Sequence, residues 1–194
     1  MEKYDVLEPD HFYHIYNRGN NKENLFVEDS NYSHFLNLVK KHISPIADVY
    51  VYCLLKNHFH LLIKIKSREE LSLINKINLD KLSQPFSNLF NAYTKAINKK
   101  YNREGSLFKV RFKRNRITDL NYLRNVILYI HLNPLKHGFT DNYQEYLYSS
   151  YKSILSSKPT ILKREEVIVL FDDKDNFIHV HYENEQSDNF EELE

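Results

Sequence analysis

The most informative stretch of this chain is YCLLKNHFHLLI, residues 52–63. Its apolar, β-branched and aromatic residues predict β-strand structure. Side chains alternate between the two faces of a strand, so His58 and His60 are expected side by side on one face, with Phe59 turned into the core. Two neutral imidazoles held close together suit a divalent cation. The pair taken alone is a weak signal, because histidines with structural roles occur at this spacing by chance.

The rest of the chain predicts a mixed α+β domain. The expected order is a strand at 11–16, a helix at 29–42, strands at 47–55 and 58–66, a helix from Ser83, a strand or basic hairpin arm at 107–117, and a helix after Asp119. This order is typical of a ferredoxin-like fold, in which helices pack on one face of a single antiparallel sheet. We therefore expect an α+β domain at residues 1–155 and an acidic extension at residues 156–194.

Two of these segments carry specific burial predictions. In the strand or arm, the apolar side chains expected together on one side are Phe108, Val110 and Phe112. The last helix is expected to be capped by Asp119 and to end at Pro134. Its predicted buried stripe consists of Leu120, Leu123, Ile127 and Ile130.

Composition indicates one domain in a reducing compartment. The 194 residues are enough for a single sizeable core. The single Cys53 excludes an internal disulfide and is expected to be a buried, unreactive thiol. The first residues are charged where a signal peptide would be apolar, and no run approaches the ~18 apolar residues of a membrane span. We therefore expect a cytoplasmic protein without a membrane segment.

Charge is distributed unevenly along the chain, although its net value is only +1. Residues 156–194 hold 4 basic and 11 acidic side chains; this extension is expected to be helical around 163–171 and disordered over its last dozen residues. Residues 95–116, in contrast, hold nine basic side chains against the single Glu104. Such a concentration indicates a surface that binds the phosphate backbone of a nucleic acid, and a solvated charged face is the alternative.

The basic side chains expected to contact DNA belong to this segment or to the loop after the first predicted strand. They are Arg18, Lys95, Lys99, Lys100, Arg103, Lys109, Arg111, Lys113, Arg114 and Arg116. Contacts of this kind give affinity and salt dependence rather than sequence choice. For Arg18 a plain loop role is an equal alternative.

Tyr129 and Asn133 lie four residues apart on the last predicted helix and therefore share a face. If that face meets the two histidines, a metal could take two imidazoles and the Asn133 carbonyl oxygen, with the Tyr129 phenol beside it. A divalent cation neutralises and polarises a phosphodiester, and a phenol is a weak nucleophile until a metal or base assists it. His131 lies about 200° around the helix from Tyr129 and is not expected to be a ligand. His14 is a candidate for a supporting contact behind the ligands.

Four segments in order resemble one family. They are YHIYNRGN (13–20), YCLLKNHFHLLI (52–63), GSLFKVRFK (105–113) and YIHLNP (129–134). The chain is similar over about residues 10–155 to the HUH single-strand DNA endonucleases, particularly the single-tyrosine transposases associated with repetitive extragenic palindromes. It departs from them at Lys56, where members often have proline.

This resemblance implies an HUH endonuclease fold and a function. His58 and His60 match the metal pair, Asn133 the third ligand and Tyr129 the nucleophile. The implied metal is Mg²⁺ or Mn²⁺. The implied reaction is cleavage and rejoining of single-stranded, hairpin-forming DNA through a 5′-phosphotyrosine with a free 3′-OH, by a monomer or a homodimer.

Two other functions remain open at this stage. One is a domesticated protein that binds a DNA or RNA hairpin on the same scaffold without cutting it. The other is an unrelated metal-dependent hydrolase that uses the two histidines with water. The presence of all four residues, Tyr129, His58, His60 and Asn133, disfavours a pure binder, which has no need of them. The hydrolase predicts no covalent adduct.

Overall fold

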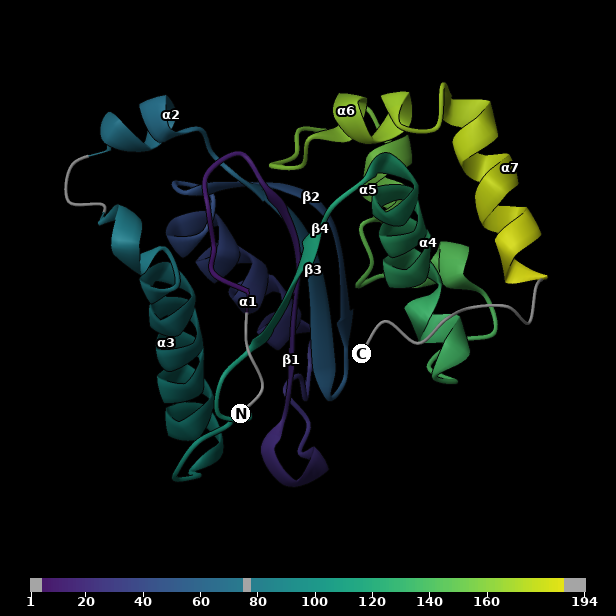
Figure 1. The fold of residues 1–194 in the computed structure, drawn as a ribbon. Coiled ribbons are helices and arrows are strands. Elements are labelled where there is room, and N and C mark those ends of the chain that lie inside the picture. Colours follow the sequence, from purple (N-terminus) through teal and green to yellow (C-terminus); the bar gives the residue numbers. More distant parts are fainter. Residues whose placement is uncertain (1–4, 75–77, 187–194) are drawn as a thin grey trace.

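The computed structural model describes residues 5–74 and 78–186 and contains a four-stranded antiparallel sheet (Figure 1). Its strands are β1 (Phe12–Arg18), β2 (Ala47–Leu55), β3 (His58–Ile65) and β4 (Lys113–Ile117). In space they follow the order β2-β3-β1-β4. The β2–β3 hairpin turns at Lys56 and Asn57. The predicted antiparallel sheet is confirmed, and its first three strands lie close to their expected bounds.

The helices also follow the predicted order. They are α1 (Asp29–His42), α2 (Arg68–Ser72), α3 (Gln84–Tyr101), α4 (Leu120–Lys136), α5 (Tyr151–Leu155), α6 (Arg164–Val169) and α7 (Lys174–Glu185). Short 3-10 turns occupy Asn20–Lys22, Leu79–Lys81 and Tyr143–Glu145. Pro85 lies in the first turn of α3, where its missing N–H costs little. Within the described ranges, no helix has both the length and the apolar composition required to cross a membrane.

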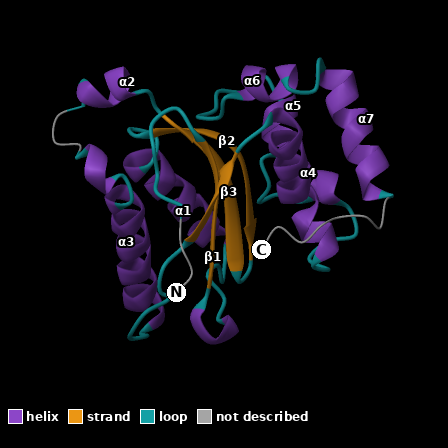
Figure 2. Ribbon diagram, in the orientation of Figure 1, coloured by secondary structure: helices purple, strands orange, loops and turns teal. Residues whose placement is uncertain are grey.

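Helices cover both faces of the sheet (Figures 1 and 2). Helices α1 and α3 lie on one side, and α4 lies on the other with α5, α6 and α7 behind it. The prediction that helices pack on one face only is therefore wrong. The reason lies in β3, where every residue except His58 and Lys64 is buried. A strand buried on both faces shows a continuous apolar run instead of an alternation, and this strand has such a run after His60.

The pleat of β3 divides its side chains between two packing layers. Phe59 is fully buried on the side of α1 and α3, with its ring 5.0 Å from Phe35 and 5.7 Å from Phe90. This confirms the prediction that Phe59 turns into the core. Cys53 is also fully buried, and burial raises the pKa of its thiol, as expected of an unreactive cysteine.

Only the second half of the 107–117 segment is a strand. Residues 107–112 form an arch in which Arg111 has a φ of 67°, in the left-handed region. This turn interrupts the alternation, so Phe108 and Phe112 are buried while Val110 is 83% exposed. The prediction that Val110 shares a side with the two phenylalanines is wrong. The arch is held to β1, because the Lys109 N–H donates to the Arg18 carbonyl and the Asn17 amide donates to the Lys109 carbonyl.

Helix α4 extends two residues beyond its predicted end. Asp119 caps it as expected, its carboxylate accepting from the Tyr122 N–H at 2.9 Å. Pro134 lies inside the last turn, where its missing N–H removes one hydrogen bond, and the His137 N–H still donates to the Asn133 carbonyl. Of the predicted stripe, Leu123, Ile127 and Ile130 are buried. Leu120 is 62% exposed because it is the first helical residue, ahead of the buried turns.

The described part of the acidic extension packs on the sheet and on α4. The Lys163 N–H donates to the Val49 carbonyl of β2, and Tyr50 donates to the carboxylate of Glu166. The helix expected around 163–171 is present as α6. Disorder over the last dozen residues is not found at 183–185, which complete α7, and residues 187–194 lie outside the described residues. The domain boundary at residue 155 stays a prediction.

A buried chain of hydrogen bonds joins β2, α4, α5 and α7. His181 Nδ1 lies 2.7 Å from the Phe177 carbonyl, and His181 Nε2 lies 2.9 Å from His131 Nδ1. His131 Nε2 lies 2.8 Å from the Ser150 hydroxyl, which accepts from the Tyr52 N–H. One assignment of protons satisfies every contact: each imidazole is neutral and donates from Nδ1. A proton added to His181 Nε2 would face the His131 N–H, and one added to His131 Nε2 would displace the proton that the Ser150 hydroxyl donates there.

The surroundings of the two histidines oppose their protonation. The pKa of His181 falls from its ordinary 6.5 to about 4, because burial among the rings of Tyr143, Phe171 and Phe177 disfavours the imidazolium. Burial and the neighbouring His181 also lower the pKa of His131. The unfolded chain therefore takes up protons before the folded protein does as the pH falls.

We expect acid to destabilise the protein through His181. Stability is complete above pH 6.5 and is lost as the pH falls towards 4, with a decrease in unfolding free energy on the order of 2 kcal/mol at pH 5. Urea unfolding at pH 7 and pH 5 measures this. His181→Gln should reduce the difference between the two pH values, whereas the exposed His179→Gln should leave it unchanged. An equal loss in both variants would contradict the assignment.

Candidate metal and nucleophile site

The two histidines of β3 lie on the sheet face that α4 covers. The antiparallel register sets Tyr16 opposite His60 and Arg18 opposite His58. The His58 and His60 rings are 5.2 Å apart between centroids. His60 is completely buried and His58 is half-buried at the end of the strand, facing a cleft. The side-by-side placement predicted from the strand alternation is therefore present.

The contacts of His58 are compatible with a bound cation. Its Nδ1 lies 2.7 Å from the amide oxygen of Asn57, and its Nε2 lies 3.2 Å from the amide oxygen of Asn133. A neutral imidazole has only one N–H, so it can donate to only one of these two acceptors. At the other contact, two lone pairs face each other unless a second proton or a cation lies between them, or the Asn133 amide turns its NH₂ group towards the imidazole. A separation of 3.2 Å also suits adjacent ligands around Mg²⁺, whose oxygen ligands lie at about 2.0–2.1 Å.

His60 has a supporting partner behind it. Its Nδ1 lies 2.9 Å from Nε2 of His14 on β1, and the two rings stack at 5.1 Å between centroids. When His60 donates from Nδ1, its Nε2 carries the lone pair that a metal requires. Ligand histidines are commonly oriented in this way by a second hydrogen bond. The structure thus places His14 where a supporting contact was predicted, and its role stays a prediction.

Tyr129 and Asn133 reach the histidines from α4. The Tyr129 ring lies edge-on to His60 at 5.5 Å and to His14 at 5.9 Å between centroids. The side chain is 3% exposed. The spacing of four residues therefore brings the phenol and the amide oxygen to the same place, as the sequence predicted. His131, between them, faces α7, in agreement with the prediction that it is not a ligand.

Three polar neighbours were missed by the sequence analysis. The Lys136 ammonium lies 5.6 Å from the centroid of the Tyr129 ring. The His137 ring lies 5.1 Å from that of His58, and Asn57 holds the other side of the same imidazole. A signal existed for Lys136, which is seven residues after Tyr129 and so shares its helix face.

The side chains around His58 and His60 provide three metal ligands only if the amide oxygen of Asn133 is counted. Among the residues that the structure describes, no group of three His, Cys, Asp or Glu side chains converges as a metal site. The candidate ligands are therefore two imidazoles and the oxygen of Asn133. The Asn133 side chain is completely buried, and its amide nitrogen has no hydrogen-bond partner among the described residues. Burying an amide nitrogen without a hydrogen-bond partner costs stability, and this cost falls on the side chain that would supply the oxygen ligand.

The predicted DNA-binding cations do not form one surface. Those that line a cleft of about 430 Å³ beside His58 and His60 are Arg18, Lys109, Arg111 and Lys113. Three others make ion pairs with distant carboxylates: Lys100 with Glu28, Arg103 with Glu23, and Arg116 with Glu8. Lys95 and Lys99 are exposed on α3, across the sheet from the histidines. Arg114 lies opposite Ile15 in the pairing of β4 with β1. Its guanidinium lies 5.1 Å from the Phe112 ring centroid.

Comparison with known proteins supports the resemblance seen in the sequence. No protein-family model matches the chain. A Haemophilus influenzae protein that carries the name Putative REP-associated tyrosine transposase is 30% identical over 102 residues. That match covers 51% of this chain and 56% of the relative, so the chain spans about half the length of the curated protein it matches.

The fold is shared with a solved structure. A REP-associated tyrosine transposase bound to a REP hairpin superposes with a TM-score of 0.62 at 16% identity, over 82% of this chain and 89% of the other. At this identity the match shows the fold. Together, the sequence match and the structural match confirm the predicted resemblance to these transposases and the α+β fold.

We expect the contact between His14 and His60 to stabilise the folded protein. In His14→Leu, the buried His60 nitrogen loses this partner, which should lower the unfolding free energy by about 1–3 kcal/mol. Urea unfolding at pH 7 measures the change. The exposed His179→Leu is the control and should stay within about 0.5 kcal/mol of the parent protein. Equal stability of His14→Leu and the control would show that the contact contributes nothing.

Proposed function

We propose that this chain is a REP-associated tyrosine transposase that nicks and rejoins single-stranded, hairpin-forming DNA. The observation that carries the proposal is the convergence of Tyr129 and Asn133 of α4 on His58 and His60 of β3. A tyrosine with only a packing role would not need the imidazole pair and the amide oxygen beside it. The fold match to a transposase bound to a REP hairpin supports the choice of substrate.

The metal-binding groups are His58 Nε2, His60 Nε2 and Asn133 Oδ1. A bound Mg²⁺ or Mn²⁺ would neutralise the phosphodiester and polarise its phosphoryl oxygen. Asn57 and His14 orient the two imidazoles through their Nδ1 atoms. Asn133, held on a helix, fixes the position of its oxygen relative to His58. These contacts support the proposal because they leave the Nε2 lone pairs of His58 and His60 available to a metal.

In the proposed reaction, Tyr129 is the nucleophile. Its phenolic oxygen attacks phosphorus, an O–P bond forms, and the bond from phosphorus to the 3′-oxygen breaks. The phenol loses its proton, and the leaving strand gains one as a free 3′-OH. The ammonium of Lys136, 5.6 Å from the ring centroid, supplies positive charge beside a phenol that must lose its proton. Attack by a 3′-OH on the phosphotyrosine reverses these steps and rejoins the DNA.

One copy of the chain contains the whole proposed centre. Tyr129 contacts the His60 ring of its own chain, so cleavage requires no tyrosine from a second copy. A tyrosine still forms one covalent link at a time, and complete strand exchange requires a second copy or a second round. The choice between monomer and homodimer and the cytoplasmic location stay predictions.

Tyr129→Phe should abolish a covalent adduct with DNA. The assay incubates a labelled hairpin-forming single strand with Mn²⁺ and detects an SDS-resistant adduct. The variant should retain DNA affinity, because it loses only a hydroxyl. Tyr122→Phe, on the same helix, is the matched control and should form the adduct. Cleavage that survives Tyr129→Phe would indicate a hydrolase that uses water. Binding without any adduct in the parent protein would indicate a non-cleaving hairpin binder.

Metal binding is testable without DNA. Titration with Mn²⁺, followed by the electron paramagnetic resonance of the unbound ion, should show one site in the parent protein. His58→Ala, His60→Ala and Asn133→Ala should each weaken it by at least about tenfold. His179→Ala should bind as the parent protein does. Unchanged affinity in His58→Ala and His60→Ala would remove this metal site from the proposal.

A further inference from the structure

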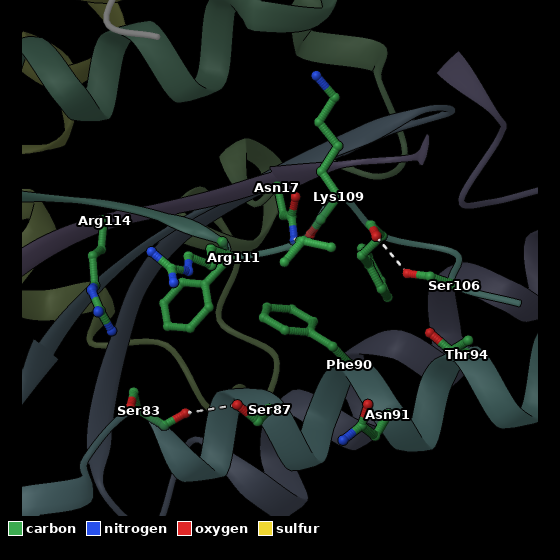
Figure 3. Close-up of a pocket in the computed structure, with 13 residues that line it drawn as sticks. Asn17, Ser83, Ser87, Phe90, Asn91, Thr94, Ser106, Lys109, Arg111 and Arg114 are labelled. Carbon is green, nitrogen blue, oxygen red and sulfur yellow. Dashed lines mark hydrogen bonds between the residues drawn. The ribbon is translucent and has the colours of Figure 1, made fainter. Parts of the chain in front are cut away.

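The two long helices that flank the sheet, α3 and α4, are held by different kinds of contact. Helix α3 meets the 107–112 arch through aromatic rings: Phe90 lies 4.9 Å from Phe108 and 5.5 Å from Phe112 between ring centroids. Figure 3 shows Phe90 directed from α3 towards the arch, beside a groove of about 460 Å³. Apolar contacts are non-directional and set no fixed rotation of a helix about its axis. Helix α4, in contrast, is held by hydrogen bonds on the side that faces α7.

His131 is the residue of α4 that makes these hydrogen bonds. It is completely buried, and its Nδ1–H donates to Nε2 of His181 on α7, at 2.9 Å. Its Nε2 accepts from the Ser150 hydroxyl at 2.8 Å, and Ser150 in turn accepts from the Tyr52 N–H of β2. One side chain of α4 is therefore tied both to the sheet and to the C-terminal extension. No step of the reaction proposed above uses His131.

The geometry of a helix links His131 to the candidate site. His131 follows Tyr129 by two residues and precedes Asn133 by two, and each step of two residues turns the helix by about 200°. Tyr129 and Asn133 therefore lie on the opposite side of α4. A rotation of α4 by ~10° would move an atom about 5–6 Å from the helix axis by about 1 Å. A misplacement of about 1 Å can lower a reaction rate on the order of a hundredfold.

We propose that His131 is a positioning residue, whose hydrogen bonds fix the rotation of α4 about its own axis. This rotation aims Tyr129 and Asn133 at the histidines of β3. The proposal rests on the function proposed above and adds the C-terminal extension to the catalytic unit. His181 lies beyond residue 155, so the domain expected at residues 1–155 lacks one of the two partners of His131.

Substitutions on α7 test this tether without altering α4. His181→Leu keeps an apolar side chain among the surrounding rings and removes the acceptor of the His131 N–H. His181→Gln is the conservative variant, because its amide oxygen can accept the same hydrogen bond. Phe171→Leu is the matched control. Phe171 packs on His181 at 5.7 Å between ring centroids, so this change weakens the packing of α7 and keeps both partners of His131.

The first measurement follows the contact between Tyr129 and His60, through nuclear Overhauser effects between their ring protons in the folded protein at pH 7. The parent protein should show these effects, because the two rings are 5.5 Å apart between centroids. His181→Leu should lose most of their intensity, whereas His181→Gln and Phe171→Leu should keep it. This measurement requires neither metal nor DNA.

The second measurement is the rate of adduct formation at saturating DNA with Mn²⁺. His181→Leu should lower this rate by about 10- to 100-fold and leave the DNA concentration at half-maximal rate within about twofold of the parent value. Binding of Mn²⁺, followed by the electron paramagnetic resonance of the unbound ion, should weaken by about tenfold, because the position of the Asn133 oxygen changes. His181→Gln and Phe171→Leu should stay close to the parent protein in both.

The control variants decide whether the effect is one of position. Equal losses in His181→Leu and Phe171→Leu would overturn the proposal, because weaker packing would then explain both. Equal losses in His181→Leu and His181→Gln, or parent behaviour in His181→Leu, would also overturn it. Ring contacts that depend on His181, without adduct or Mn²⁺ binding in the parent protein, would support the positioning of α4 and count against the proposed function. Absence of the ring contacts from the parent protein would overturn both.

Discussion

The pairing register between β1 and β3 is the constraint on which the site depends. Side chains alternate along β3, so the imidazoles and Phe59 fall on opposite faces, and the register places Tyr16 opposite His60 and Asn17 opposite Phe59. Phe59 then anchors α1 and α3 to the sheet, while His60 meets His14 and the tyrosine of α4. A slip of one residue would exchange the two faces and place a polar pair in an aromatic core. Packing on one side of the sheet therefore fixes the candidate chemistry on the other.

Helix α4 has two buried faces, one against the histidines of the sheet and one against the C-terminal helices. Tyr129 and Asn133 face the histidines of the sheet, and His131, between them in sequence, is held by Ser150 and His181 on the other side. The helix is thus fixed about its own axis by hydrogen bonds that leave little freedom for rotation. Burial alone is non-directional and would tolerate such a rotation. The C-terminal helices accordingly support the position of the proposed nucleophile through the hydrogen bonds of His131.

Local patterns predicted most of the elements, and contacts distant in sequence account for the errors. The bounds of α1, the β2–β3 hairpin and the shared face of Tyr129 and Asn133 follow from residue spacing. The left-handed turn at Arg111 has no marker, since no glycine stands there. The basic segment reads as one surface, but the pleat of β4 sends Lys113 and Arg114 to opposite faces, and glutamates 72 to 108 residues away pair with Lys100, Arg103 and Arg116. The link between His131 and His181 spans 50 residues and cannot be read from spacing.

The hydrogen bond from the Lys163 N–H to the Val49 carbonyl is one of several by which later residues cover the outer edge of β2. The Leu54 N–H donates to the Tyr148 carbonyl, and the Ser150 N–H donates to the Tyr52 carbonyl, so backbone groups that would otherwise face outward already have partners. Exposed strand edges recruit strands from other molecules and so promote aggregation. Here the chain occupies that edge with its own later residues. The sheet therefore cannot grow by strand addition at β2, and its other edge is a strand of only five residues, three of them cationic.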